Sequence, residues 1–281
     1  MARLTIIGLG YSGAAVARAA LGAGFAVRAT SRDPAARWMQ GVEIVGFGPE
    51  ALADATHILM TAAPGEAGDP VLPAMAAAIG GRWAGYLSTT GVYGDRGGAW
   101  VDEDSEPAPL SARTQRRVAA ELHWAALADR MAVDIFRVAG IYGPGRSALD
   151  DVRAGTARRV IKPGHAFGRI HRDDIARAVV AAMRQDMPPG RRVFNLNDDE
   201  PAESALVVEE AARLLGVPLP PETPFADAWA AMGPMARSFW AENRRVSSVR
   251  TQQVLGIAWA YPSYREGLRA ILHEEAADGG A

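Results

Sequence analysis

One glycine-rich string constrains the fold of this chain more than any other feature. Residues 8–13 read GLGYSG, which places glycines at positions 8, 10 and 13. The string follows a short apolar segment, RLTII, and precedes an alanine-rich segment, SGAAVARAALG. A glycine turn between an apolar strand and a helix is typical of the first strand–turn–helix unit of a parallel sheet. We therefore expect the chain to open with such a unit.

The same alternation of strand and helix continues along most of the chain. Further strand candidates are FAVRAT, VEIVGF, HILMTA, WAGYLSTT, VDIFRV and RVFNL. Helical segments are expected between them, at about 70–79, 111–131, 173–185 and 203–215. Because parallel strands need crossover connections, this rhythm predicts an α/β fold with a doubly wound parallel sheet of the Rossmann type.

The rhythm changes after Asn195, where a proline-rich segment and an aromatic tail follow. This change indicates a second, smaller C-terminal region. We expect the Rossmann domain to comprise residues 1–145 and 166–198, and the smaller lobe to comprise residues 146–165 and 199–281.

Composition excludes several classes of function. The 30 basic and 32 acidic residues leave a net charge of −2, so no global field favours nucleic acid. No apolar run approaches the roughly 20 residues that cross a bilayer. The absence of cysteine excludes disulfides and thiolate chemistry, and the five scattered histidines indicate no metal site. The first residues enter a strand without an apolar signal segment, so we expect a cytoplasmic protein.

The glycine string has the spacing of a dinucleotide site. Gly8 permits a tight turn, Gly10 lets the backbone approach a pyrophosphate, and Gly13 lets the helix pack closely on the strand. Tyr11 and Ser12 lie between them, at the helix N-terminus, where free N–H groups face phosphate charge. We therefore predict that these five residues bind a nicotinamide dinucleotide.

The end of the second strand discriminates between NAD and NADP. The chain reads ATSRDP there, and Ser31 with Arg32 is suited to a ribose 2′-phosphate. We predict NADP in preference to NAD. The alternative is that Asp33 accepts from the ribose 2′-OH and that Arg32 is only solvated. Arg28 is a weaker candidate because strand alternation can point it elsewhere.

Four further stretches carry a family resemblance. They are LSTTGVYGD at 87–95, FRVAGIYGPGR at 136–146, RIHRDDIARAV at 169–179 and FNLNDDEP at 194–201. In this order, and with the glycine string, they resemble the extended short-chain dehydrogenase/reductases, which include NAD-dependent epimerases and dehydratases acting on nucleotide sugars. The resemblance implies a Rossmann domain with a C-terminal substrate lobe, and by analogy a homodimer through the helix at 111–131.

The resemblance assigns roles to the LSTTGVYGD stretch. Thr89 matches the residue that hydrogen-bonds the reacting carbonyl or hydroxyl in that family, and Ser88 and Thr90 are its neighbours. Tyr93 is a further candidate for proton transfer, although the family's tyrosine at this place is normally structural. Thr90 is also a candidate for contact with substrate.

The family's tyrosine and lysine pair is missing from the next helix. Aligning VAAE with the family places Arg117 at the lysine position and Arg113 at the tyrosine position. A guanidinium stays protonated and cannot act as an acid or base. Arg117 can still hydrogen-bond the nicotinamide ribose.

This departure resembles an atypical subgroup, the bacterial YeeZ-type proteins, which share TSRDP and TAAPGEAGDPVL as well as the missing tyrosine. The resemblance implies that Ala62, Ala63 and Pro64 approach the dinucleotide. Tyr142 and Arg146, in the GIYGPGR stretch, are candidates for contact with substrate. His171, Asp173 and Asp174 are interpreted as anchoring and capping the following helix, and Phe239 and Trp240 as core of the small lobe.

Two functions follow. The first is an NADP-dependent reductase or epimerase-like enzyme that transfers hydride to a small molecule, either a nucleotide sugar or another carbonyl compound. The second is an NADP-binding regulator, or sensor, without turnover. The missing tyrosine leaves the choice between them open.

Overall fold

Seven parallel strands form the central sheet of the protein. The computed structural model describes residues 2–278. The strand order is β11-β7-β5-β4-β1-β2-β3, and every pairing in it is parallel. The bounds are β1 Arg3–Ile7, β2 Ala26–Thr30, β3 Val42–Val45, β4 His57–Met60, β5 Trp83–Thr89, β7 Ala132–Val138 and β11 Gly190–Leu196. The predicted doubly wound sheet is confirmed, with all seven expected strands in it.

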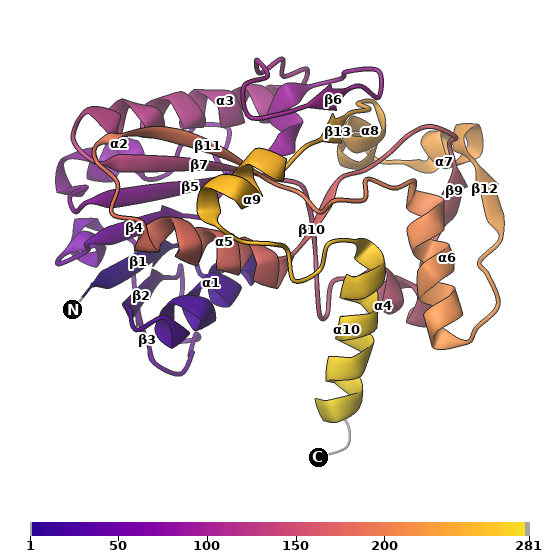
Figure 1. Ribbon diagram of the computed structural model, residues 1–281, viewed down its shortest axis with the longest axis horizontal. Coiled ribbons are helices and arrows are strands. Elements are labelled where there is room, and N and C mark those ends of the chain that lie inside the picture. Colours follow the sequence, from indigo (N-terminus) through magenta and orange to yellow (C-terminus); the bar gives the residue numbers. More distant parts are fainter. Residues whose placement is uncertain (1, 279–281) are drawn as a thin grey trace.

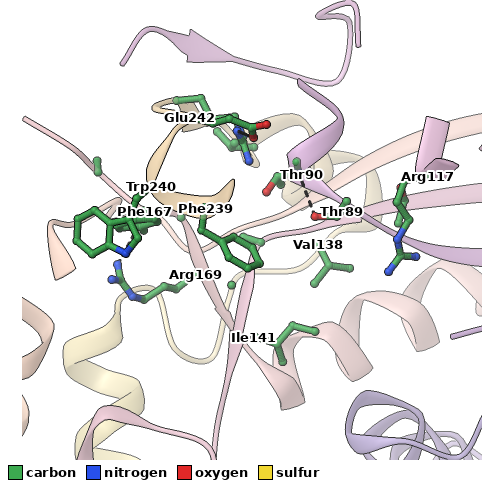
Figure 2. A pocket seen from close by; sticks show the side chains of 18 of the residues that line it. Thr89, Thr90, Arg117, Val138, Ile141, Phe167, Arg169, Phe239, Trp240 and Glu242 are labelled. Atoms are coloured by element: carbon green, nitrogen blue, oxygen red, sulfur yellow. Dashed lines mark hydrogen bonds and ion pairs between the residues drawn. The ribbon is translucent and has the colours of Figure 1, made fainter. Parts of the chain in front are cut away.

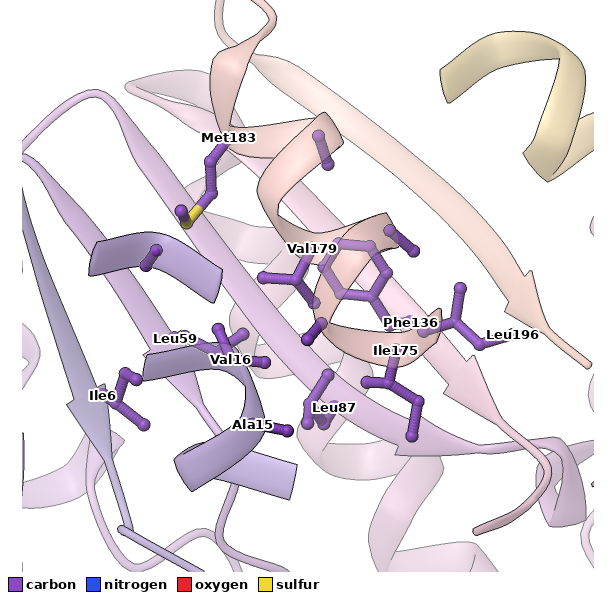
Figure 3. Close-up of a cluster of buried hydrophobic side chains, with 14 of the residues drawn as sticks. Ile6, Ala15, Val16, Leu59, Leu87, Phe136, Ile175, Val179, Met183 and Leu196 are labelled. Carbon is purple, nitrogen blue, oxygen red and sulfur yellow. The ribbon is translucent and has the colours of Figure 1, made fainter. Parts of the chain in front are cut away.

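Helices cover both faces of this sheet (Figure 1). Helices α1 (Tyr11–Gly22) and α5 (Arg172–Arg184) lie on one face, where Val16, Phe136 and Val179 belong to one apolar core (Figure 3). Helices α2 (Leu72–Met75) and α3 (Ala112–Ala125) cover the other face. The 3-10 segments are η1 Pro49–Leu52, η2 Ala76–Ala78, η3 Thr90–Tyr93 and η4 Ala126–Asp129. Burial of apolar surface on both faces stabilises the sheet.

The smaller lobe has an apolar core of its own. Tyr142, Leu149, Val207, Tyr264 and Leu268 meet there. The lobe contains α4 Ala148–Arg153, β9 Arg159–Ile161, α6 Ser204–Leu215, β12 Glu222–Pro224, α7 Phe225–Ala231, α8 Pro234–Trp240 and α10 Tyr264–Asp278. Strands β9 and β12 pair in parallel, which joins two segments that the sequence separates.

Part of the C-terminal region returns to the Rossmann domain. Strand β13 (Arg245–Val246) pairs with β6 (Trp100–Val101), and α9 (Val249–Leu255) follows it. Leu255 and Trp259 belong to the core under α1 and α5. The packing therefore places Leu255 and Trp259 in the core of the Rossmann domain, whereas the sequence-based division assigned all of 199–281 to the small lobe. Strands β8 (Gly140–Tyr142) and β10 (Arg169–His171) pair where the two lobes meet.

Asp174 holds the returning segment in place. Its side chain is fully buried and accepts hydrogen bonds from Ala260 N at 2.8 Å and Tyr261 N at 2.9 Å. The role differs from the simple helix capping that the sequence suggested. His171 is the N-cap of α5, as expected of an anchoring residue, with Nδ1 accepting from Asp173 N at 3.3 Å. Within residues 2–278, no helix is both long and apolar enough to cross a bilayer.

Candidate active site

The glycine turn lies where the strand order reverses. Strand β1 has β2 on one side and β4 on the other, so the chain turns after β1 at the crevice where such sheets bind ligands. Gly8 has a φ of +99°, which disfavours a side chain. A Cβ at Gly13 would lie 2.6 Å from the Gly8 carbonyl oxygen, so only glycine permits this approach.

Two threonines hold the glycine turn, and the sequence reasoning assigned neither of them a role. Thr30 at the end of β2 accepts from Gly8 N at 3.0 Å, and Thr61 after β4 donates to Gly8 O at 2.5 Å. Ala62 lies beside them, because a Cβ at Gly8 would be 3.5 Å from its Cβ. Ala62 therefore lies against the glycine turn, and the approach of Ala62, Ala63 and Pro64 to a dinucleotide stays a prediction. A signal was available in the sequence, since each threonine lies at the carboxyl end of a strand that borders β1.

The N-terminus of α1 is open. Its N-cap, Gly10, gives no side-chain cap, and a Cβ there would meet no atom within 4 Å. Ser12 lies in the first turn, and the Tyr11 hydroxyl donates to Pro144 O at 3.0 Å. Uncapped N–H groups beside a tight glycine turn suit a pyrophosphate, so the residues present fit a dinucleotide.

Arg32, in the segment after β2, is a cation without a hydrogen-bonded partner in the described part of the chain. Arg32 is exposed and makes no hydrogen bond or ion pair within residues 2–278. Asp33 is already engaged, because its carboxylate accepts from Ala36 N at 3.2 Å and its backbone bonds the Ser31 hydroxyl. Arg28 is buried and bonded to Glu43, so it points away from this segment.

A cavity of about 520 Å³ opens at the carboxyl ends of β5 and β7, between the two lobes (Figure 2). Its walls contain five arginines and one carboxylate. The polar and charged residues of the lining are Ser88, Thr89, Thr90, Arg113, Arg117, Arg146, Arg169, Ser204, Glu242 and Arg244. The apolar ones include Val138, Ile141, Phe167, Phe239 and Trp240. The arrangement suits an anionic ligand with an apolar part.

The candidate hydroxyls of Ser88, Thr89 and Thr90 differ in their hydrogen bonds, and so in whether their hydrogen is available to a ligand. Thr89 accepts from Gly91 N at 3.1 Å, so its own proton stays available to a ligand. Ser88 is buried and donates its only proton to Glu121 at 2.5 Å. Thr90 begins η3 and lines the cavity. The geometry therefore favours Thr89 over Ser88 as the donor to a substrate carbonyl.

The two tyrosine candidates lie away from this cavity. Tyr93 has no exposed surface, its hydroxyl donates to Asn195 at 2.8 Å, and burial raises its pKa. This placement argues against the proton-transfer role that the sequence suggested. Tyr142 lines a second cavity of about 470 Å³ in the small lobe, and its hydroxyl donates to Ser263 O at 3.3 Å. Burial raises its pKa as well.

Arg117 and Arg113 lie one turn apart on α3 and both line the cavity. Arg117 Nη1 donates to Leu87 O at 2.9 Å and to the Tyr86 hydroxyl at 3.0 Å, which fixes the guanidinium at the end of β5. Its other nitrogens remain for a ligand. Arg146, at the rim, lies over the Tyr11 ring at 5.7 Å and also borders the second cavity.

A buried ion pair behind the cavity has no counterpart in the sequence-based predictions. Arg137 Nη2 lies 2.8 Å from Glu121 Oε2, and both side chains are buried. The pair joins α3 to β7, and through the Ser88 hydroxyl it also joins β5. Within residues 2–278, no group of three or more histidine and acidic side chains could hold a metal ion.

Several proteins of known structure have the same fold as this chain. No family model matches the chain. The structure of MoeE5 in complex with UDP-glucuronic acid and NAD has a TM-score of 0.77 at 19% identity, over 98% of this chain and 99% of that one. Human epimerase family protein SDR39U1 with NADPH has a TM-score of 0.75 at 19% identity, over 96% and 98%. The chain shares the fold of these two structures, which agrees with the fold that the family resemblance implied.

A nearer relative defines the family more narrowly. A functionally unknown conserved protein from Silicibacter pomeroyi DSS is 42% identical over 98% of this chain and 99% of its own, with a TM-score of 0.89. The chain belongs to the same family as that protein. A 3-diazoavenalumate denitrifying reductase from Streptomyces is 32% identical over 181 residues, and the match spans 60% of this chain and 58% of the reductase. Membership of the YeeZ-type subgroup stays a prediction.

Proposed function

We propose that this protein is an NADP-dependent reductase or epimerase-like enzyme that reduces a small carbonyl substrate in the cavity beside Thr89. The observation that carries the proposal is a hydroxyl with a free proton at the end of β5, in a cavity at the sheet edge that also bears the glycine turn. The reductase name of the Streptomyces relative supports hydride transfer. The complexes of MoeE5 with NAD and of human SDR39U1 with NADPH support a nicotinamide dinucleotide.

In the proposed reaction, different residues of this chain would bind the cofactor and stabilise the reacting carbonyl. The glycine turn and the first turn of α1 would bind the pyrophosphate. Thr89 would donate a hydrogen bond to the substrate carbonyl oxygen and so stabilise the negative charge that develops there, and water or a second side chain would supply the proton that completes the alcohol. Arg117 would seat the nicotinamide ribose. The cofactor would supply the hydride.

Arg32 tests the predicted preference for NADP. Replacing Arg32 with Ala should weaken NADPH binding about 10- to 100-fold, because a charge-assisted bond to the 2′-phosphate is lost. Binding of NADH should be unchanged. Calorimetric titration with both cofactors measures the effect, and Arg18→Ala, on the exposed side of α1, is the control. Equal losses for NADPH and NADH would contradict the 2′-phosphate role.

Thr89 tests the catalytic role. Thr89→Ala should reduce turnover of a carbonyl substrate about 10²- to 10³-fold with NADPH affinity kept, since only the stabilisation of the developing charge is removed. Thr89→Ser keeps the hydroxyl and should retain most of the activity. The rate of NADPH oxidation measures this, after a screen of carbonyl compounds with the unmodified protein. An unchanged rate in Thr89→Ala would overturn the assignment.

The missing tyrosine supports the alternative, a sensor that binds NADP without turnover. Arg113 stands at the family position of that tyrosine, and Tyr93 is buried. NADPH binding without oxidation of NADPH by any carbonyl compound would favour the sensor. The homodimer through α3 and the choice between a nucleotide sugar and another carbonyl substrate also stay proposals.

A further inference from the structure

Arg113 is a half-buried cation without a hydrogen-bonded partner. Within residues 2–278 it forms no hydrogen bond and no ion pair, and its contact is with the Phe239 ring, whose centroid lies 4.9 Å from its Cζ. Burial, together with the charges of Arg117 and Arg244, lowers its pKa, although Glu242 acts in the opposite sense. A guanidinium stacked on a ring keeps its N–H donors at its edge, free to bind a ligand.

Three of the other four arginines of the cavity have hydrogen-bonded partners, and the fourth, Arg146, is exposed rather than half-buried. Arg244 bonds Glu242 and the Gly94 carbonyl, and Arg169 bonds the carbonyls of Phe167 and Ala202. Arg117 is held by β5, and Arg146 is exposed at the rim. Among residues 2–278, Glu242 is the only carboxylate of the lining, and it is already paired with Arg244. The cavity thus has uncompensated positive charge, and Arg113 is a half-buried arginine of the lining whose N–H donors are all free within residues 2–278.

Arg113 lies near Thr89, where the reaction is proposed to occur. The next residue, Thr114, packs on η3, since a Cβ at Gly91 would be 3.1 Å from its methyl group. Gly91 in turn donates to the Thr89 hydroxyl oxygen. The first turn of α3 and the end of β5 are therefore in contact, and an anion on Arg113 would be close to the carbonyl on Thr89.

An aromatic wall faces this charge. Phe239 remains 48% exposed, which a residue of the lobe core would not be, and the sequence-based core assignment is wrong for it. In Figure 2 its ring lies between Phe167 and Trp240 on one side and Thr89 on the other. Phe167 and Trp240 pack edge to face with centroids 4.9 Å apart. A flat apolar ligand would cover these rings.

We propose that the substrate is an aromatic carboxylic acid whose carboxylate pairs with the Arg113 guanidinium and whose ring lies against Phe239 and Trp240. The inference rests on the proposed function and names its substrate class. A planar carboxylate matches the edge of one guanidinium with two parallel hydrogen bonds. A nucleotide diphosphate fits less well, because the unpartnered charge lies beside Thr89 and the same 520 Å³ must also admit the nicotinamide.

The test is calorimetric titration with benzoylformate, whose carboxylate is one bond from its carbonyl, on protein with and without saturating NADPH. Acetophenone lacks the charge, pyruvate lacks the ring, and UDP-glucose carries the diphosphate. Benzoylformate should bind at least 10-fold more tightly than each of the three. Tighter binding of UDP-glucose, or equal binding of benzoylformate and acetophenone, would overturn the inference.

Variants locate the site. Arg113→Gln should weaken benzoylformate binding about 10- to 100-fold and leave acetophenone unaffected, since only the charge-assisted pair is lost. Phe239→Leu should weaken benzoylformate but not pyruvate. Arg184→Gln, on the exposed side of α5, is the matched control. An Arg113→Gln protein that binds NADPH normally and benzoylformate undiminished would contradict the assignment. NADPH binding without benzoylformate binding rejects this inference alone, whereas failure to bind NADPH rejects the proposed function.

Discussion

Lowering the pH from 6.5 to 4 should destabilise the fold steeply, by up to about 1.4 kcal/mol per pH unit for each of three buried histidines. Burial lowers the pKa of His57, His165 and His171 to about 4. Nearby cations, Arg82, Lys162 and Arg172 respectively, add to the effect.

Stability falls as the pH falls because the folded and unfolded states bind protons at different pH values. The unfolded chain takes up protons on these histidines near pH 6.5, but the folded chain does so only near pH 4. Proton binding therefore favours the unfolded state between pH 6.5 and 4. Below about pH 4 the histidines cause no further loss of folding stability. Buried Asp198 acts in the opposite sense, because burial raises its pKa, so the net slope is smaller than the sum over the histidines.

His165 isolates one contribution. Its ring stacks on Trp240 at 5.4 Å, so His165→Phe keeps an aromatic packing partner and removes the titration. The free energy of unfolding, measured with urea at several pH values, should then depend on pH less steeply by up to about 1.4 kcal/mol per unit. His123→Gln, at an exposed position of α3, is the control and should leave the slope unchanged. An identical slope in His165→Phe and the unmodified protein would show that His165 does not contribute.

Replacing Glu121 with Ala should cost about 3–5 kcal/mol of stability, the typical loss when one partner of a buried ion pair is removed. Glu121 and Arg137 are 6% and 5% exposed, so the Arg137 charge would stay in the core without a carboxylate. Hydrogen bonds to Glu121 raise the pKa of Arg137 against the effect of burial. The Ser88 hydroxyl would lose its acceptor as well.

Urea denaturation measures this loss, and two further variants interpret it. Glu121→Gln keeps the volume and an acceptor and should cost less than Glu121→Ala. Asp186→Ala removes the exposed ion pair with Arg82, whose atoms are 3.7 Å apart, and should cost less than about 1 kcal/mol. If Glu121→Ala lowered the free energy of unfolding no more than Asp186→Ala does, the Arg137 guanidinium would have to be hydrated or paired with another group in the folded state.

The sequence was most informative where a physical constraint is local. Alternating apolar runs predicted each strand of the central sheet, because burial on two faces requires them. The glycine turn was predictable because a φ of +99° at Gly8 and the 2.6 Å approach at Gly13 leave no room for a side chain. The choice of residues 88–90 as candidate hydroxyls at the end of β5 came instead from the family resemblance.

Tertiary structure alone decided how these residues are used. Ser88 and Thr89 are neighbours that both carry a hydroxyl. The Ser88 hydroxyl donates a hydrogen bond to Glu121 on α3, whereas the Thr89 hydroxyl only accepts one and keeps its hydrogen free. Phe239, far along the chain, comes to Arg113 only because α8 packs across the cleft. Such contacts join distant segments, and the periodicity or spacing within one segment does not predict which other segment it contacts. The sequence by itself determined the sheet and the glycine turn, whereas long-range packing decided which charges and hydroxyls remain available in the cavity.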